Sequence, residues 1–165
     1  MFEKIIVPLD GSELAEVALP YAEEIAGRMG SDLILLYVKE PNETRSQHML
    51  QCYLESIAST AKAGAEKYLA ESGTKKINIE TKILTGNPAE EIINFADSTE
   101  GAKVIMATHG QSGITRWALG SVADKVTRAT VRPERTSLRT ETSGGWRSET
   151  RPPTESRPSL WQCTR

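Results

Sequence analysis

The chain has 165 residues, a formal net charge of −2 at pH 7 and a charged residue at 25% of its positions, which is the size of one domain with a buried core. No stretch approaches the roughly 20 apolar residues of a membrane span, and the N-terminus lacks the features of a signal peptide. We therefore expect a cytoplasmic protein without a membrane partner. The near-neutral charge argues against nucleic acid as the main partner. Cys52 and Cys163 have no companion at metal or redox spacing.

The first half of the chain begins with two apolar runs separated by a helical pattern. Residues 3–9 and 32–38 contain continuous apolar runs typical of parallel strands buried on both faces. Between them, the apolar spacing predicts one helix from Ser12 to Met29, with Ser12 as its N-cap and Gly30 as its stop. These elements predict a first β-α-β unit.

The pattern continues with two more helices around a weaker strand. Residues 48–71 keep a helical apolar stripe and predict a long second helix. Residues 77–83 alternate apolar and polar, which favours a strand near a sheet edge with one wetter face. Residues 87–98 predict a third helix, because Asn87 can cap it and Pro88 fits its first position.

Residues 104–107 predict a short fourth strand, and residues 122–128 predict the last helix. Strand and helix thus alternate throughout the first 130 residues. With right-handed crossovers, this order predicts an α/β protein with a doubly wound, mainly parallel open sheet.

Residues 107–121 form a glycine-containing segment between the fourth strand and the last helix, as in strand-loop-helix phosphate sites. Gly110, Gly113 and Gly120 let the backbone approach a phosphate without a Cβ in the way. Gly120 and Ser121 also offer amide donors and a hydroxyl at the helix N-terminus, where the helix dipole favours an anion. The implied ligand is a nucleotide or another phosphorylated molecule.

This segment is not a P-loop, because no Gly-Lys-Ser/Thr occurs in it. The ligand's charge must be neutralised by backbone amides, by a bound cation, or by Arg116 or Lys125, each of which is otherwise a solvated helix charge. Thr108 and His109 are candidates to touch a phosphate or sugar, and His109 can equally hold the loop. No catalytic residue is predicted, since neither histidine lies in a serine-nucleophile motif.

Asp10 follows the first strand, and in an open α/β sheet the ligand lies beyond the carboxyl ends of the strands where the strand order reverses. There its carboxylate would accept hydrogen bonds from ribose or adenine, or hold a divalent cation that bridges to phosphate oxygens. The alternative is that Asp10 only caps the first helix or its turn.

The composition changes at Pro133. Residues 134–165 contain no Lys, Ile, Val or Ala and consist largely of Arg, Ser, Thr, Pro and Glu. Such a segment is typical of a disordered or loosely draped tail. The abrupt exchange of lysine for arginine suggests a shift of codon usage, and we interpret the tail as an out-of-frame extension. The alternative is a genuine tail that binds an acidic partner. We therefore divide the chain into a domain at 1–133 and a tail at 134–165.

Three segments resemble the universal stress protein family: Ile-Ile-Val-Pro-Leu-Asp-Gly-Ser at residues 5–12, Gly-Asn-Pro-Ala-Glu-Glu-Ile at 86–92, and Ala-Thr-His-Gly followed nine residues later by Gly120-Ser121. The resemblance covers roughly residues 2–133. It implies the Rossmann-like fold of the adenine nucleotide alpha hydrolase type. The family's ATP signature is Gly-x-x-Gly, nine residues, then Gly-Ser or Gly-Thr, and this chain departs from it only at Ala107.

The resemblance also implies a ligand and its contacts. Members that keep the signature bind ATP, often with Mg²⁺ or Mn²⁺, and act as stress-linked nucleotide sensors with slow hydrolysis or none. By this likeness Asp10 contacts the nucleoside and Val38 reads adenine through its backbone. The remaining implied contacts are a base pocket shaped by Pro8 and Leu9, phosphates held by Gly110, Gly120 and Ser121, and neighbouring backbone from Met106 and Val122.

In the family a valine-rich fifth strand follows the position of Pro133 and commonly pairs two subunits into a homodimer. Here Glu-Arg-Thr-Ser-Leu-Arg stands at residues 134–139, so we expect the fifth strand to be missing or replaced. Strand four would then have an exposed edge that could recruit another chain, which argues against dimerisation through the usual surface.

The leading hypothesis is an ATP-binding regulator whose bound state is read by a partner protein. Three alternatives stay open: a weak metal-dependent ATPase or phosphotransferase, a nucleotide-free family member that acts through protein contacts, and a different nucleotide-processing enzyme.

Overall fold

The computed structural model describes residues 3–72, 76–108, 120–130 and 163–164. Strands and helices alternate along the chain in the order β1 (Lys4–Leu9), α1 (Glu13–Glu16), α2 (Leu19–Met29), β2 (Asp32–Lys39), α3 (Gln47–Ser72), β3 (Ile79–Thr85), α4 (Pro88–Ser98), β4 (Ala102–Ile105), α5 (Ser121–Thr130) and β5 (Cys163–Thr164). None of the helices in these ranges is long and apolar enough to cross a membrane.

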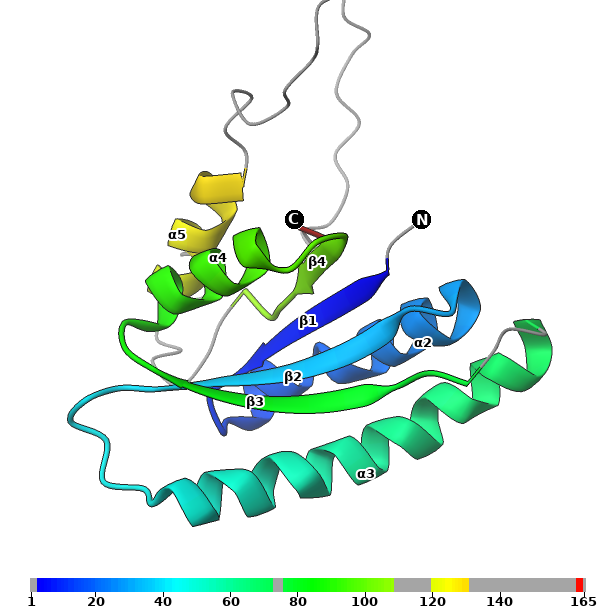
Figure 1. The fold of residues 1–165 in the computed structure, drawn as a ribbon, viewed down its shortest axis with the longest axis horizontal. Coiled ribbons are helices and arrows are strands. Elements are labelled where there is room, and N and C mark those ends of the chain that lie inside the picture. The colour runs from blue at the N-terminus through cyan, green and yellow to red at the C-terminus, as the bar shows by residue number, and fades with distance from the viewer. Residues whose placement is uncertain (1–2, 73–75, 109–119, 131–162, 165) are drawn as a thin grey trace, which may run out of the picture.

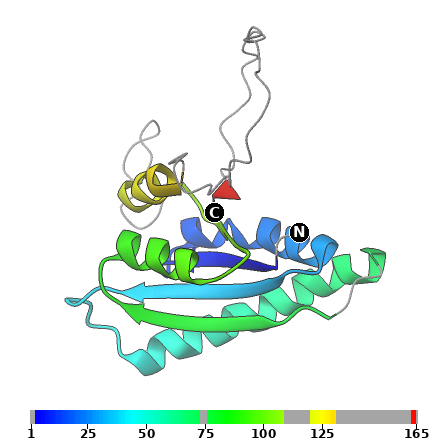
Figure 2. The ribbon, with the colours of Figure 1, turned by 45° about the horizontal axis from the view of Figure 1, so that its top comes forward.

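The strands form one sheet in the order β3-β2-β1-β4-β5, with β1 to β4 parallel. Helices α2 and α3 cover one face, whereas α4 and α5 lie together on the other (Figure 1). The view in Figure 2 agrees, with α3 and α4 on opposite sides of the strands. The predicted doubly wound α/β fold is therefore confirmed, and β3 lies at the sheet edge as its alternating pattern indicated.

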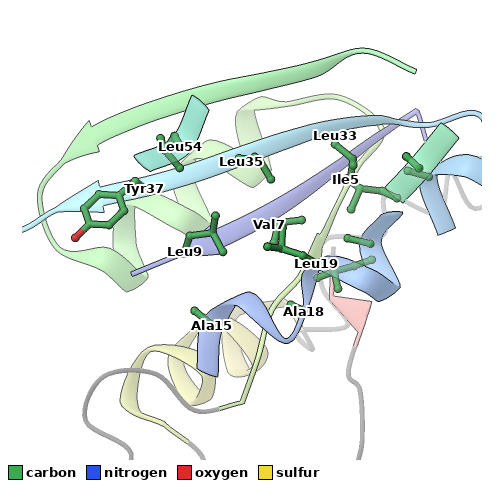
Figure 3. Packing of buried hydrophobic residues seen from close by; sticks show 14 of the residues in the cluster. Ile5, Val7, Leu9, Ala15, Ala18, Leu19, Leu33, Leu35, Tyr37 and Leu54 are labelled. Carbon is green, nitrogen blue, oxygen red and sulfur yellow. The ribbon is translucent and has the colours of Figure 1, made fainter. Parts of the chain in front are cut away.

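Strands β1 and β2 are apolar at every position except their charged end residues, because both of their faces are buried. Val7 and Leu35 point toward α2 and α3 (Figure 3), while Ile6 and Leu36 belong to the apolar layer under α4 and α5. All four side chains are fully buried. This two-sided burial explains why the sequence shows continuous apolar runs instead of alternation.

The predicted helix from residue 12 to residue 29 is two helices, because its regular hydrogen-bond pattern is interrupted between Glu16 and Leu19, although Val17 and Ala18 keep helical backbone angles. Pro20 accounts for the break, since proline lacks a backbone N–H and its ring clashes with the carbonyl four residues earlier. The predicted ends are confirmed. Ser12 Oγ accepts a hydrogen bond of 3.2 Å from the α1 backbone, and Gly30 ends α2 with φ of 69°.

Strand β4 begins and ends two residues earlier than predicted. Lys103 interrupts the apolar pattern, which hid the start of the strand, yet Ala102 already pairs with Lys4 of β1. The paired register ends at Ile6 and Val104. Beyond Ile105 the chain leaves the sheet, so the predicted strand residues 106 and 107 are outside it.

The family's fifth strand is replaced, as expected, and β5 takes a place beside β4, with Cys163 and Thr164 paired antiparallel with Ile105 and Val104. Strand β4 thus has a neighbour over two residues, contrary to the expectation of an open edge. An edge strand presents backbone donors and acceptors that pair with an extended segment whatever its side chains, so the polar composition of the tail does not prevent this pairing. The rest of the predicted tail lies outside the described residues.

Helices α2 and α3 approach each other at two glycines. A Cβ added to Gly27 would lie 2.6 Å from Tyr68 Cβ and 2.9 Å from the backbone oxygen of Ala65. A Cβ added to Gly64 would instead meet the carboxylate end of Glu23. The first obstacle is fixed by the helix backbone, whereas the second is the far end of a flexible side chain.

We expect Gly27→Ala to lower the free energy of unfolding by about 1–3 kcal/mol, because α2 and α3 must separate to admit the methyl group. Gly64→Ala is the matched control and should be neutral or raise stability by up to about 1 kcal/mol, since alanine favours a helix interior and Glu23 can swing aside. Urea denaturation of the two variants measures this difference. Equal losses in both would contradict the close approach at Gly27.

Candidate functional site

A cavity of about 520 Å³ lies at the carboxyl ends of β1, β2 and β4. This is the point where the strand order reverses, since β1 has β2 on one side and β4 on the other. Every predicted site residue that the structure describes lines it, namely Pro8, Leu9, Asp10, Val38, Met106, Ala107, Thr108, Gly120, Ser121 and Val122. The other three, His109, Gly110 and Gly113, lie outside the described residues.

One side of the cavity is apolar. Leu36 and Val38 come from the end of β2, Ile92 comes from α4, and Met106 and Val122 flank the segment between β4 and α5. The same side chains belong to the core layer under α4 and α5, so their positions are fixed by packing. Such a wall is suited to the flat, largely apolar face of a ring system.

The N-terminus of α5 forms another side. The Gly120 N–H donates to the Thr108 carbonyl at 2.8 Å, which brings the two ends of the glycine-containing segment together. Residues 121–123 of the first turn line the cavity. Their N–H groups precede the first intrahelical hydrogen bonds and carry the positive end of the helix dipole, which favours an anion. Asp124 forms an ion pair with Arg128 one turn along the helix, with 2.9 Å between Asp124 Oδ2 and Arg128 Nε.

Asp10 makes the turn contacts that the sequence analysis gave as one alternative, and its place on the cavity wall is compatible with the other. Its Oδ1 accepts hydrogen bonds from the Ser12 N–H at 2.9 Å and from the Ser12 hydroxyl at 2.6 Å. Ser12 in turn caps α1, and Gly11 between them has φ of 81°. The carboxylate is therefore fixed in the turn before α1, and it lines the cavity at the same time.

Sequence reasoning missed the loop that follows β2. Glu40, Asn42, Glu43 and Arg45 all line the cavity, although none stood out in the sequence. Its position in the chain could have predicted this role, because the polar loop leaves the same edge of the sheet as the segments after β1 and β4. Of the two cations predicted from sequence, Lys125 is exposed on α5 and does not line the cavity, and Arg116 lies outside the described residues.

Tyr37 holds this loop against the end of β1. Its ring is buried and lies near the carboxyl ends of β1 and β2 (Figure 3). The hydroxyl donates to Glu43 at 2.9 Å and lies 3.5 Å from the Asp10 carbonyl. Arg45 pairs with Glu43 and lies 5.4 Å from the centroid of the Tyr37 ring. Burial, reinforced by the hydrogen bond to Glu43, raises the pKa of Tyr37 above its ordinary value, so the hydroxyl stays a donor.

A second tyrosine connects this group to α1. Tyr53 of α3 meets Tyr37 edge-on with ring centroids 6.5 Å apart, and its hydroxyl donates to Glu16 at 2.8 Å. Burial and then the hydrogen bond to Glu16 raise the pKa of Tyr53. The wall of the cavity is therefore tied to helices on one face of the sheet.

These raised pKa values predict a loss of stability at alkaline pH. As pH rises past 10.0, the ordinary tyrosine pKa, tyrosines ionise in the unfolded chain while Tyr53 keeps its proton in the folded one. The stabilisation is fully present below that pH and is lost above it. We expect Tyr53→Phe to show a smaller fall in the free energy of unfolding between about pH 8 and about pH 11, measured by urea denaturation. The same fall in both proteins would contradict this.

Within the described ranges, no group of three or more His, Cys, Asp or Glu residues is arranged to hold a metal ion. A Mg²⁺ ion bound together with a nucleotide does not require such a group, because it keeps several waters and takes one or two carboxylates plus phosphate oxygens. Asp10, for which holding such a cation is one of two possible ligand roles, lies on the cavity wall.

A parallel sheet with a cavity at its switch point, bordered by a helix N-terminus, defines an α/β protein with a candidate small-molecule site. The profile of the universal stress protein family matches residues 1–133. Universal stress protein MJ0531 of Methanocaldococcus jannaschii is 32% identical over 133 residues, covering 76% of each chain. The chain belongs to the universal stress protein family, which confirms the resemblance seen in its sequence.

Solved structures agree with this assignment. The universal stress protein UspA from Lactobacillus plantarum is 25% identical with a TM-score of 0.55, covering 78% of this chain and 92% of its own. The structure of hypothetical protein MJ0577 is 31% identical with a TM-score of 0.53, covering 78% and 90%.

Proposed function

We propose that the protein binds ATP in the cavity at the ends of β1, β2 and β4, and that it acts in the cytoplasm as a nucleotide-dependent regulator in stress response. The observation that carries the proposal is the convergence of three separate segments on one cavity. The residues after β1, at the end of β2 and around the start of α5 are those that the family resemblance assigns to the nucleoside, the adenine and the phosphates, and all of them that the structure describes line the cavity. Its volume of about 520 Å³ is within the range of small-molecule sites.

Each part of the nucleotide has suitable chemistry nearby. The adenine ring would lie on the apolar wall beside Val38, whose backbone the family resemblance assigns to the base. The ribose hydroxyls would donate to Asp10, whose carboxylate is held by Ser12. The phosphates would lie at the first turn of α5, and Mg²⁺ or Mn²⁺ would supply positive charge that offsets the repulsion from Asp10.

The alternative of a nucleotide-free member that acts through protein contacts rests on Ala107, which stands at the first glycine of the family signature and lines the cavity. Its Cβ adds one methyl group, a small change for a cavity of this volume. In the ATP-binding proposal, a partner protein reads the bound state, and residues 1–133 form the binding domain. Slow hydrolysis is compatible with this role, because a sensor needs the bound state to persist.

The first test is whether nucleotide is present and whether it binds. The protein is denatured, the released small molecules are identified by mass spectrometry, and the protein stripped of ligand is titrated with ATP and Mg²⁺ by calorimetry. Co-purified ATP or micromolar affinity supports the proposal. If no nucleotide is released and no binding heat is detected, the proposal is overturned in favour of a role through protein contacts.

Gly120→Val tests the phosphate end of the site. The new side chain adds bulk where α5 begins, and we expect ATP affinity to fall at least about tenfold, which corresponds to 1.4 kcal/mol. Ala129→Val is the matched control: it also adds bulk to α5 but lies outside the cavity lining, so affinity should stay within about twofold. Thermal melting checks that both variants fold. Unchanged affinity in a folded Gly120→Val protein would contradict phosphate binding at α5.

A further inference from the structure

The polar rim of the cavity is dominated by negative charge. Asp10, Glu40 and Glu43 bring three carboxylates to the described lining, and Arg45 is the lone lysine or arginine there. Like charges disfavour one another most strongly in a partly buried site, where water screens them little. The binding of a phosphorylated ligand in this cavity therefore depends on whether the Arg45 guanidinium is available to the phosphate.

Arg45 is held at the rim but keeps hydrogen-bonding capacity. Its Nε pairs with Glu43, and its Nη2 lies 3.5 Å from the Asp10 carbonyl oxygen, beyond the usual range of a strong hydrogen bond. A guanidinium has five N–H donors, so these two contacts use only part of it. The Arg45 side chain is 35% exposed, compared with 14% for Glu43, so the carboxylate is the more buried partner of the ion pair and the cation is the more exposed one.

The position of Arg45 is also fixed by its contact with the Tyr37 ring. Its guanidinium lies over the Tyr37 ring, 5.4 Å from the centroid, and the Tyr37 hydroxyl donates to the same Glu43 oxygen that Arg45 pairs with. Arginine stacked on an aromatic ring and anchored at one edge is pre-organised to offer its remaining edge to an oxyanion. Little additional side-chain entropy is then lost when the ligand binds.

We infer that Arg45 is the side chain by which the cavity distinguishes a phosphorylated nucleotide from the nucleoside. Its Nη atoms leave the long contact with the Asp10 carbonyl and donate to a phosphate oxygen, while Glu43 and Tyr37 keep the guanidinium at the rim. Arg45 is a ligand-contacting residue in this account, and Glu43 and Tyr37 are positioning residues. The inference rests on the proposed nucleotide site and adds to it the origin of the preference for phosphate.

The test compares adenosine, AMP and ATP, each titrated with Mg²⁺ by calorimetry into the full chain and its Arg45→Gln variant. Glutamine keeps a polar side chain but removes the charge and the forked donors. We expect ATP affinity to fall about tenfold or more, the loss typical of one charge-assisted hydrogen bond, and adenosine affinity to change by less than about twofold. AMP shows whether the loss already appears at the first phosphate.

Arg28→Gln is a closely matched control. Arg28 also pairs with a glutamate, Glu24 at 2.9 Å, and also lies 5.4 Å from a tyrosine ring centroid, that of Tyr68. It lies on α2, outside the cavity lining. Its removal makes the same change in net charge, so any effect of overall charge on ATP binding appears in both variants.

The outcomes separate the inference from the proposed function. A loss confined to the phosphorylated ligands and to Arg45→Gln supports it. An equal loss for adenosine and ATP would mean that Arg45 only shapes the cavity wall, and an unchanged ATP affinity would mean that it does not contact phosphate; either result overturns the inference while ATP binding stands. Wild-type protein that does not bind ATP would overturn the proposed function and this inference with it.

Discussion

The parallel pairing of β1 with both β2 and β4 is the constraint on which the rest of the molecule depends. A strand with parallel neighbours on both sides needs crossover helices, and the two crossovers cover opposite faces of the sheet. Both faces of β1 are thereby buried. At its carboxyl end, the chain turns toward α1 while the segments from β2 and β4 turn elsewhere, so the three loops diverge and leave a cavity between them.

The cavity inherits its two-sided character from the alternation of side chains along β2. Leu36 and Val38 face the layer under α4 and α5, and Tyr37 between them faces the layer under α2 and α3. The apolar wall and the tyrosine that holds the polar rim thus come from successive residues of one strand. A change in the packing of α3 against Tyr37 reaches the rim directly, because the Tyr37 hydroxyl holds Glu43.

The elements with local signals could be predicted from the sequence. The buried strands, the Ser12 and Asn87 caps and the Gly30 stop are each decided by a few neighbouring residues, and the structure has them as predicted. The break before α2 was missed because the apolar spacing continues across it and masks the effect of Pro20. The bounds of β4 were shifted because pairing with β1, a contact between distant residues, decides where that strand begins and ends.

The residues of the candidate site likewise divide into those with a local sequence signal and those without one. Asp10, Gly120 and Ser121 were found because turn residues at the ends of strands carry a recognisable pattern, and the structure brings them to one cavity. Arg45 and Glu43 carried no pattern, since a polar loop after a strand is common and their significance comes from what they meet. Arg45 matters because Tyr37 lies beneath it and three carboxylates share its rim. A motif identifies where a phosphate could approach the backbone, whereas the charge that we propose for phosphate binding lies on a loop whose place only the folded sheet determines.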